Sequence, residues 1–572
     1  MKNISWILVF ILLTSCSTST KKEFLDYDTR IQRGIVLMPD NSLENLDILT
    51  KDGEIISLIP NPELKKFEEL DPDIKVIDAQ GNFVMPGLID AHAHFIAMGK
   101  NMANLDFLQT TSWEEIIEMV ENKTKELPKD EWIIGRGWHQ EKWKNQPKIL
   151  IEGFPIHHEL SKVSPDHPVI LTHASGHGLI ANAKAMELGE IHAEISVPDG
   201  GIILMDSENN PTGIFQENAM NLILNAYRQH LNNKTDEEKL NEWMHHLRLA
   251  EKEALSNGIT TLHDASIEFE DALRFKKLSN ENQLNIRLYS MLSDYALQNT
   301  PKDQLKKHIE STRNDRFFTN TAVKAFVDGA LGSRGAWFIE DYSDLPGYKG
   351  ENVTSFESLE KTANISKELQ LQVCIHAIGD RGNREVIDVF EKVLGDSIGV
   401  RRWRIEHAQH LHPLDIQRIS DLDIIASMQT VHCTSDAPYV VRRIGEKRAE
   451  EGAYVWKTLL EKNVKIANGT DAPIERINPF ENIYAAVTRK GLNSDEAFYP
   501  EQKMSRENAL KIYTQSNAYA AFQESWKGKI AKNYIADILI LDTNLLTCKE
   551  DEIPDTKVLY TIVNGEIKYE FE

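Results

Sequence analysis

Short apolar runs that end in polar residues recur along most of the chain. Eight of them are rich in Val, Ile and Leu, and they span 83–94, 258–265, 284–292, 322–330, 371–380, 401–409, 422–429 and 464–473. Continuous apolar runs of this length are typical of strands that are buried on both faces of a parallel sheet. Helical patterns separate several of the runs, for example 356–370 and 241–258, where Gly258 is a stop signal.

Alternating strands and helices of this kind predict an α/β fold, and eight such units predict a (β/α)8 TIM barrel over residues 83–526. Residues 105–235 break the rhythm and contain GRGWHQEKW and SGHG. We interpret them as an insertion after the first barrel strand that folds over the active site. Active sites of this barrel form at the carboxyl ends of its strands.

The two chain ends have a different pattern from the barrel. Residues 27–82 and 527–572 consist of short strand-like runs joined by turns, and Asp52-Gly53 and Asn564-Gly565 are strong hairpin signals. We expect the two ends to pair into one small composite β-domain beside the barrel.

The first residues, MKNISWILVFILLTSCSTST, have the pattern of a targeting signal. The apolar stretch 4–13 is too short to span a membrane, which needs roughly 20 residues, and fits a secretory segment. The sequence before Cys16 resembles a bacterial lipobox. It predicts a lipoprotein signal peptide over 1–15, a lipidated Cys16, a tether over 16–26, and a lipid anchor in the bacterial cell envelope that faces the periplasm or the exterior. A plain cleaved signal peptide and a hydrophobic anchor are the alternatives.

Charge and cysteine content exclude some classes of protein. Lys and Arg number 64 and Asp and Glu number 88, so the formal net charge is −24, which argues against nucleic acid as a partner. Besides Cys16, the chain has Cys374, Cys433 and Cys548, which show no paired spacing. The sequence therefore predicts no disulfide framework.

Polar side chains gather where the apolar runs end. His92 and His94 lie two residues apart and therefore on one face of the first strand, where two imidazoles can hold one divalent cation. An isolated pair of this kind is more often a surface or core pair. Further candidates end other strands, and a barrel would bring them together: Lys324, His376, His407 and Asp471.

Several motifs along the chain resemble the amidohydrolase superfamily, and more narrowly its family 3 branch, which includes N-substituted formamide deformylases. They are PGLIDAHAH, GRGWHQEKW, SGHGLIANAKAM, VKAFVDGALGSRG, CIHAIGD, RIEHAQ and NGTDAP. Together with neighbouring matches they cover about 75–570. The resemblance implies that the composite domain is a β-sandwich.

The resemblance also implies roles for individual residues. His92 and His94 would bind the more buried metal, and His376 and His407 the second. Lys324 matches a lysine that is carboxylated and bridges two metals in many relatives. Asp471 matches an aspartate that touches a metal and handles protons.

Elementary chemistry agrees with such a centre. A bound divalent metal lowers the pKa of water to about 7 and so supplies hydroxide for attack on an amide. Asp471 is then the candidate general base and general acid, the alternative being an aspartate that caps the turn-rich GTDAP loop. Imidazole-rich ligation favours zinc. A one-metal site with unmodified Lys324 stays open, as does a surface or salt-bridged Lys324.

Substrate contacts are predicted at Trp138 and His177 in the insertion and at Asp328 and Arg334, which we also expect to position the loop after the fourth strand. Weaker candidates are His432, Asp436 and Tyr454. Glu406 precedes His407, and we expect it to point to the opposite face of its strand and to be structural.

Three functions are compatible with the sequence. The first is hydrolysis of a non-peptide C–N bond, such as that of an N-substituted formamide or a related amide. The second uses the same site on an ester, a lactone or a cyclic imide, because fold does not fix substrate. The third is a catalytically silent lipoprotein that binds a small-molecule ligand. A homodimer is compatible with all three.

Overall fold

The computed structural model describes residues 26–60, 74–395 and 398–572 of the chain. Cys16, the predicted signal peptide and most of the predicted tether lie outside the described residues. Within the described ranges, no helix is both long enough and apolar enough to cross a membrane.

Eight parallel strands form the central barrel and pair in chain order. They are β6 (Leu88–Ala93), β15 (Ile259–Ile267), β16 (Arg287–Ser293), β17 (Phe318–Phe326), β18 (Gln372–Ala377), β19 (Arg404–His407), β20 (Ile425–Met428) and β21 (Ile466–Asn468). Each strand overlaps one of the eight apolar runs, so the TIM-barrel prediction is confirmed. Next to β6, the loop after β21 completes the ring: the N–H of Asp471 donates to the carbonyl oxygen of His92 at 2.7 Å, and that of His94 to Ala472 at 2.7 Å.

Helices surround the barrel, and most of them bury their apolar faces against it in one large core. They are α1 (Phe95–Ala103), α6 (Asp236–Ser256), α7 (Phe269–Asn280), α8 (Asp294–Asn299), α9 (Lys302–Thr312), α10 (Phe356–Leu369), α11 (Asp380–Leu394), α12 (Ile398–Arg401), α13 (Pro413–Asp421), α14 (Thr430–Ile444), α15 (Glu446–Gly452), α16 (Trp456–Glu461), α17 (Pro479–Thr488), α18 (Arg506–Lys511) and α19 (Gln515–Ala520). The helices predicted at 241–258 and 356–370 are confirmed as α6 and α10. A capping box between Thr235 and Glu238 starts α6.

The first apolar run is divided between two sheets. Its first part is β5 (Phe83–Pro86), which joins the sheet made by the chain ends, and its second part is β6 of the barrel. Gly87 lies between them, and a Cβ atom there would lie 2.2 Å from the hydroxyl oxygen of Thr260. The two sheets can approach this closely only because residue 87 is a glycine.

Both chain ends contribute to one eight-stranded mixed sheet, so the predicted composite β-domain is confirmed. Its strands are β1 (Thr29–Leu37), β2 (Leu43–Lys51), β3 (Glu54–Pro60), β4 (Lys75–Asp78), β5, β22 (Ile538–Leu541), β23 (Val558–Val563) and β24 (Glu566–Glu570). Strands β5 and β22 join the two ends as an antiparallel pair. Both hairpin predictions are confirmed, because Asp52-Gly53 joins β2 to β3 and Asn564-Gly565 joins β23 to β24, all with positive φ.

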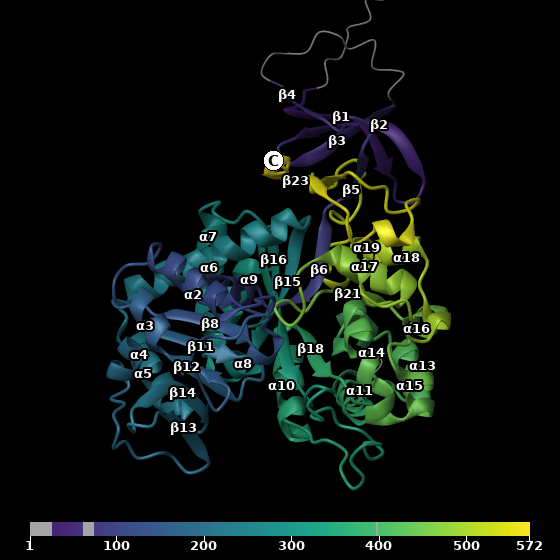
Figure 1. Ribbon diagram of the computed structural model, residues 1–572. Coiled ribbons are helices and arrows are strands. Elements are labelled where there is room, and N and C mark those ends of the chain that lie inside the picture. The colour runs from purple at the N-terminus through teal and green to yellow at the C-terminus, as the bar shows by residue number, and fades with distance from the viewer. Residues whose placement is uncertain (1–25, 61–73, 396–397) are drawn as a thin grey trace, which may run out of the picture.

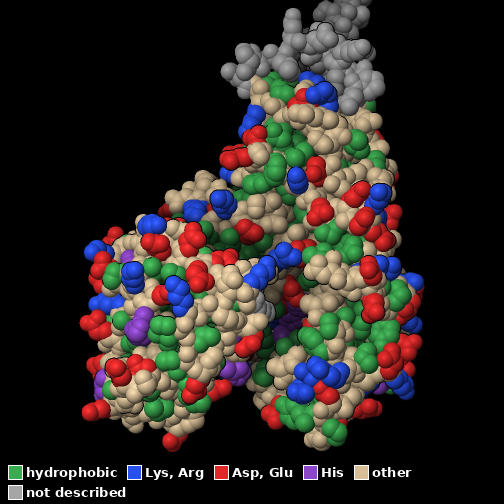
Figure 2. Space-filling model, viewed as in Figure 1, with side chains coloured by type: hydrophobic (Ala, Val, Ile, Leu, Met, Phe, Trp, Pro, Cys, Tyr) green, Lys and Arg blue, Asp and Glu red, His purple; other side chains and the backbone are tan. Residues whose placement is uncertain are grey.

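Between β6 and β15 the chain forms a separate lobe with a six-stranded sheet and its own apolar clusters. Its elements are β7 (Leu105–Asp106), α2 (Trp113–Thr124), β8 (Ile133–Trp138), β9 (Leu150–Ile151), β10 (Phe154–Pro155), α3 (His158–Val163), β11 (Val169–His173), β12 (Gly178–Ala181), α4 (Ala183–Leu188), β13 (Gly201–Met205), β14 (Pro211–Glu217) and α5 (Met220–Asn233). In Figure 1 this blue lobe lies on one side of the barrel, across from the helices α11, α14 and α15, and the composite sheet lies at the top. Figure 2 shows a deep hollow between the two sides, with histidine side chains inside it.

Candidate metal centre

Three of the predicted ligands meet where β6 and β21 end. His92 lies in β6, and His94 follows the strand as the N-cap residue of α1. Because they are two residues apart, the two side chains share one face. Their Nε2 atoms lie 3.6 Å and 3.3 Å from Oδ1 of Asp471. One ligand atom from each of the three residues lies within 4.8 Å of the other two, a spacing at which they could hold one metal ion.

The loop that carries Asp471 is held by the first strand. Asp471 has a φ of 60°, and Asp90 accepts hydrogen bonds from the hydroxyl and the backbone N–H of Thr470, at 2.6 Å and 3.1 Å. Gly469 packs so closely on this strand that a Cβ atom would lie 2.4 Å from the backbone nitrogen of His92. Asp90, the first polar residue of the DAHAH run, therefore positions the loop of Asp471.

A second group of three ligands shares Asp471 and consists of His407, His432 and Asp471. His407 ends β19 with a φ of 76°, and its Nδ1 lies 2.7 Å from the amide oxygen of Gln429. His432 lies in α14, with Nε2 at 3.7 Å from Oδ2 of Asp471 and Nδ1 at 2.9 Å from the amide nitrogen of Gln409. From the sequence, His432 was predicted only as a weak substrate contact, although its place just after the seventh strand put it at the barrel mouth.

His376 and Lys324 lie beside these two groups. The ring of His376 is 4.4 Å from that of His407, and its Nε2 is 3.6 Å from a carboxylate oxygen of Asp328. The Nζ atom of Lys324 is 3.2 Å from Nε2 of His92, and the side chain is fully buried. All six predicted ligands therefore converge, but His376 belongs to neither three-residue group.

Burial gives these side chains the protonation states that metal ligation requires. It lowers the pKa of His92 to about 4 and that of His376 to about 3, with Lys324 adding to both effects. Burial also lowers the pKa of Lys324. Burial opposes ionisation of Asp471, but its contact with His94 and the other nearby histidines outweigh this and hold its pKa well below the usual range. At neutral pH, His92 and His376 are thus neutral imidazoles and Asp471 is a carboxylate.

Several buried polar atoms of the centre lack a hydrogen bond within the described part of the chain. Nε2 of His376, Nε2 of His432 and Oδ1 of Asp471 are buried and make no hydrogen bond to any of the described residues. Buried polar atoms are nearly always paired, so a cluster of unpaired ones that face each other requires an explanation. The donor set, imidazole nitrogens with a carboxylate oxygen, fits a divalent metal ion such as zinc.

The expected orientation of Glu406 is wrong. Glu406 points into the barrel, where Oε2 lies 2.5 Å from Nδ1 of His92, and it is fully buried. Arg404 and Glu406 are two residues apart and share the inner face, whereas His407 ends the strand with a positive φ that turns it out of the alternation. Arg404 and His92 outweigh the effect of burial and lower the pKa of Glu406 to about 2.

Asp328 and Arg334 lie in the loop that follows β17. Asp328 is buried and accepts hydrogen bonds from the backbone N–H groups of Trp337, Ile378 and Gly379, at 2.9, 2.9 and 2.8 Å. Arg334 makes a two-pronged ion pair with Asp344, at 3.2 and 3.0 Å. Both contacts fix the path of the loop at the barrel mouth.

Trp138 and His177 line one cavity of about 210 Å³ in the inserted lobe. The indole N–H of Trp138 donates to the carbonyl oxygen of Leu171 at 2.8 Å, so only the ring of this buried residue is available to a ligand. His177 is exposed, and its Nδ1 lies 3.2 Å from the carboxylate of Glu217. The cavity thus has an apolar wall and a polar rim.

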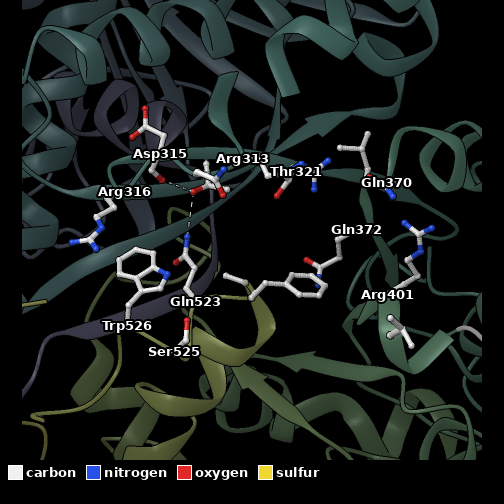
Figure 3. A pocket seen from close by; sticks show the side chains of 16 residues that line it. Arg313, Asp315, Arg316, Thr321, Gln370, Gln372, Arg401, Gln523, Ser525 and Trp526 are labelled. Carbon is white, nitrogen blue, oxygen red and sulfur yellow. Dashed lines mark hydrogen bonds between the residues drawn. The ribbon is translucent and has the colours of Figure 1, made fainter. Parts of the chain in front are cut away.

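A larger cavity of about 720 Å³ lies at the opposite end of the barrel. Its lining includes Arg313, Arg316, Gln372 and Arg401, which come from the segments before β17 and β19 and from the first residue of β18 (Figure 3). None of the predicted metal ligands lines it. Cavity size therefore does not mark the candidate centre in this molecule.

Comparison with known proteins agrees with the fold and identifies the family. The amidohydrolase family matches residues 75–569 of the chain. Protein LONG AFTER FAR-RED 3 of Arabidopsis thaliana is 30% identical over 95% of this chain and 91% of its own length, and the N-substituted formamide deformylase of Arthrobacter pascens is 26% identical over 87% and 90%. The crystal structure of an uncharacterized metal-dependent hydrolase from Pyrococcus furiosus superposes with a TM-score of 0.71 and 27% identity, and covers 91% of this chain and all of that one.

Proposed function

We propose that this chain, which belongs to the amidohydrolase family of metal-dependent hydrolases, cleaves a non-peptide C–N bond of a small molecule, such as an N-substituted formamide. The observation that carries the proposal is the convergence of His92, His94, His407 and His432 on the two carboxylate oxygens of Asp471. The similarity to an N-substituted formamide deformylase supports this class of bond.

The proposed centre contains one or two divalent metal ions, with zinc favoured by the imidazole-rich donor set. His92 and His94 with Asp471 would hold one ion, and His407 with His432 or His376 a second. Ions bound there supply a Lewis acid and an acidified water. Lys324 is fully buried 3.2 Å from His92, and burial lowers its pKa. Its neutral amine would add carbon dioxide and lose a proton to give a carbamate, whose two oxygens would be available to the ions.

Asp471 is the proton carrier in the proposed reaction. Its two oxygens face different histidines, Oδ1 toward His92 and His94 and Oδ2 toward His432, so it lies between both halves of the centre. The carboxylate accepts the proton of the attacking water and then donates it to the leaving nitrogen. The hydrogen bonds of Asp90 to Thr470 keep the loop of Asp471 in place during both transfers.

The remaining predicted residues would orient the substrate. Asp328 holds the loop after β17 against the start of α11, which fixes one wall of the mouth. Trp138 and His177 would contact the substituent from the cavity of the inserted lobe, the ring of Trp138 through apolar contact and His177 through its imidazole.

The first experiment measures metal content and hydrolysis on the same purified full chain. We expect one or two metal ions per chain, release of an amine from N-substituted formamides, loss of turnover after chelation and recovery when zinc is restored. An acid-labile carbon dioxide on the intact protein would identify the carbamate of Lys324.

Each other result assigns a different function. Cleavage of esters, lactones or cyclic imides without amide cleavage would replace the proposed bond class. Metal binding without turnover of any of these compounds would favour a ligand-binding protein. A chain that binds no metal after reconstitution would contradict the proposal.

We further propose that Cys16 carries a lipid that anchors the chain in the bacterial cell envelope. The support is the sequence before Cys16, since this residue lies outside the described part of the chain. Replacing Cys16 by Ala should block processing or release the protein from membranes, as judged by fractionation and intact mass. A C16A variant that is still membrane-bound and normally processed would contradict the anchor.

A further inference from the structure

A buried ion pair lies directly below the candidate centre, inside the barrel. Arg404 and Glu406 are both fully buried. Oε2 of Glu406 lies 2.5 Å from Nδ1 of His92. The other ring nitrogen of His92, Nε2, faces Lys324 at 3.2 Å and Asp471 at 3.6 Å.

This contact determines which nitrogen of His92 can bind a metal. An ionised carboxylate only accepts hydrogen bonds, so the nitrogen that faces Glu406 must carry the proton. In a neutral imidazole the other nitrogen then keeps its lone pair. That nitrogen is Nε2, which faces the rest of the centre.

Arg404 keeps the carboxylate in this role. Its Nε lies 3.5 Å from Oε1 of Glu406 and donates to the amide oxygen of Gln372 at 3.0 Å, while Nη1 lies 3.2 Å from Nδ1 of His263. The same oxygen of Gln372 accepts the hydroxyl of Tyr289 at 3.0 Å. Gln372, which also lines the cavity of Figure 3, thus anchors the guanidinium below Glu406.

Fold stability alone does not account for this pair. Taking two charges out of water is costly, and a buried pair is weak evidence for stability unless its geometry is good. Nη2 of Arg404 and Oε1 of Glu406 are buried and make no hydrogen bond within the described residues. By contrast, Arg287 and Asp537, also buried, make two direct hydrogen bonds, at 2.8 and 3.0 Å.

We propose that Arg404 and Glu406 are positioning residues that fix the Nδ1-protonated tautomer and the ring orientation of His92, so that Nε2 is presented as a metal ligand. The inference rests on the proposed function, because it requires that His92 binds the metal. Glu406 acts on His92 directly, and Arg404 acts through Glu406.

The test measures zinc affinity of the full chain by competition with a chelator. E406Q replaces a carboxylate, which can only accept a hydrogen bond, by an amide that can either accept or donate, so the tautomer of His92 is no longer imposed. Weakening such an outer-shell contact typically lowers metal affinity by about 10- to 100-fold, and we expect a loss in this range. In an H92N background, E406Q should cause no further loss, because Glu406 acts through His92. If Glu406 were merely structural, E406Q would instead lower zinc affinity or stability equally in the wild-type and H92N backgrounds.

D537N is the matched control. It breaks another buried Arg–carboxylate pair, Arg287–Asp537, which contacts none of the candidate ligands, and should lower the thermal unfolding temperature without changing zinc affinity. Unchanged affinity in E406Q overturns the positioning inference and leaves the proposed function intact. A wild-type chain that binds no zinc overturns both.

A second measurement needs no variant at position 406. The ¹⁵N resonances of His92 in the metal-free chain, assigned by comparison with H92N, report which nitrogen carries the proton. A proton on Nδ1 supports the inference, and a proton on Nε2 overturns it.

Discussion

The two ends of the barrel both bury charged side chains but satisfy them differently. At the amino end, Arg287 makes two hydrogen bonds to Asp537 and a third to the carbonyl oxygen of Arg316, at 2.9 Å. At the carboxyl end, His376, His432 and Asp471 each bury an atom without a partner among the described residues. A fully paired group at one end stabilises the fold, whereas unpaired groups that converge at the other end indicate a bound species.

The two ends also differ in whether a cavity or a cluster of donor atoms marks them. The amino end has a cavity of about 720 Å³ lined by arginines, yet none of the histidines that converge on Asp471 borders it. The carboxyl end is recognised by its donor atoms and their spacing instead. Convergent chemistry is therefore a better guide to function in this fold than cavity volume.

The largest effect is expected from the replacement of Asp471 by Asn. The amide keeps the shape of the side chain but cannot carry the proton, so turnover should fall by about 10²- to 10⁴-fold. Turnover is measured by amine release and the fold by circular dichroism. A D471N variant with near-normal turnover would remove Asp471 from the proposed reaction.

The second-largest effect is expected from D537N at the amino end, and it is a loss of stability. D537N leaves Arg287 as an unpaired buried charge, and breaking a buried pair in this way costs about 3–5 kcal/mol. Denaturant unfolding of the metal-free chain measures the loss. Turnover per folded molecule should not change, and a loss of turnover without a loss of stability would mean that the two ends of the barrel are not separate in function.

The smallest effect is expected from R313A in the large cavity. Arg313 is exposed at the carboxyl end of α9, where loss of a cation costs about 0.3–1 kcal/mol of unfolding free energy. We expect unchanged metal content and turnover. A clear fall in turnover would show that the arginine-lined cavity takes part in the reaction.

Much of this architecture was predictable because it depends on local pattern. Apolar runs located the barrel strands, and the residues at their ends, such as His92 and Asp471, located the candidate centre. The inward orientation of Glu406 was not predictable, since it depends on a positive φ at His407 that sequence alternation does not reveal. The proximity of His432 to Asp471 was not predictable either, because it depends on how α14 is set against the loop after β21.

The division of one apolar run at Gly87 has a consequence for the order in which the protein is made. Strand β5, just before the metal-ligand strand β6, pairs with β22 from the opposite end of the chain. A ribosome must therefore synthesise the chain as far as β22 before strand β5 gains this partner. Pairings between such distant segments also form slowly, so we expect the composite sheet to be completed late in folding.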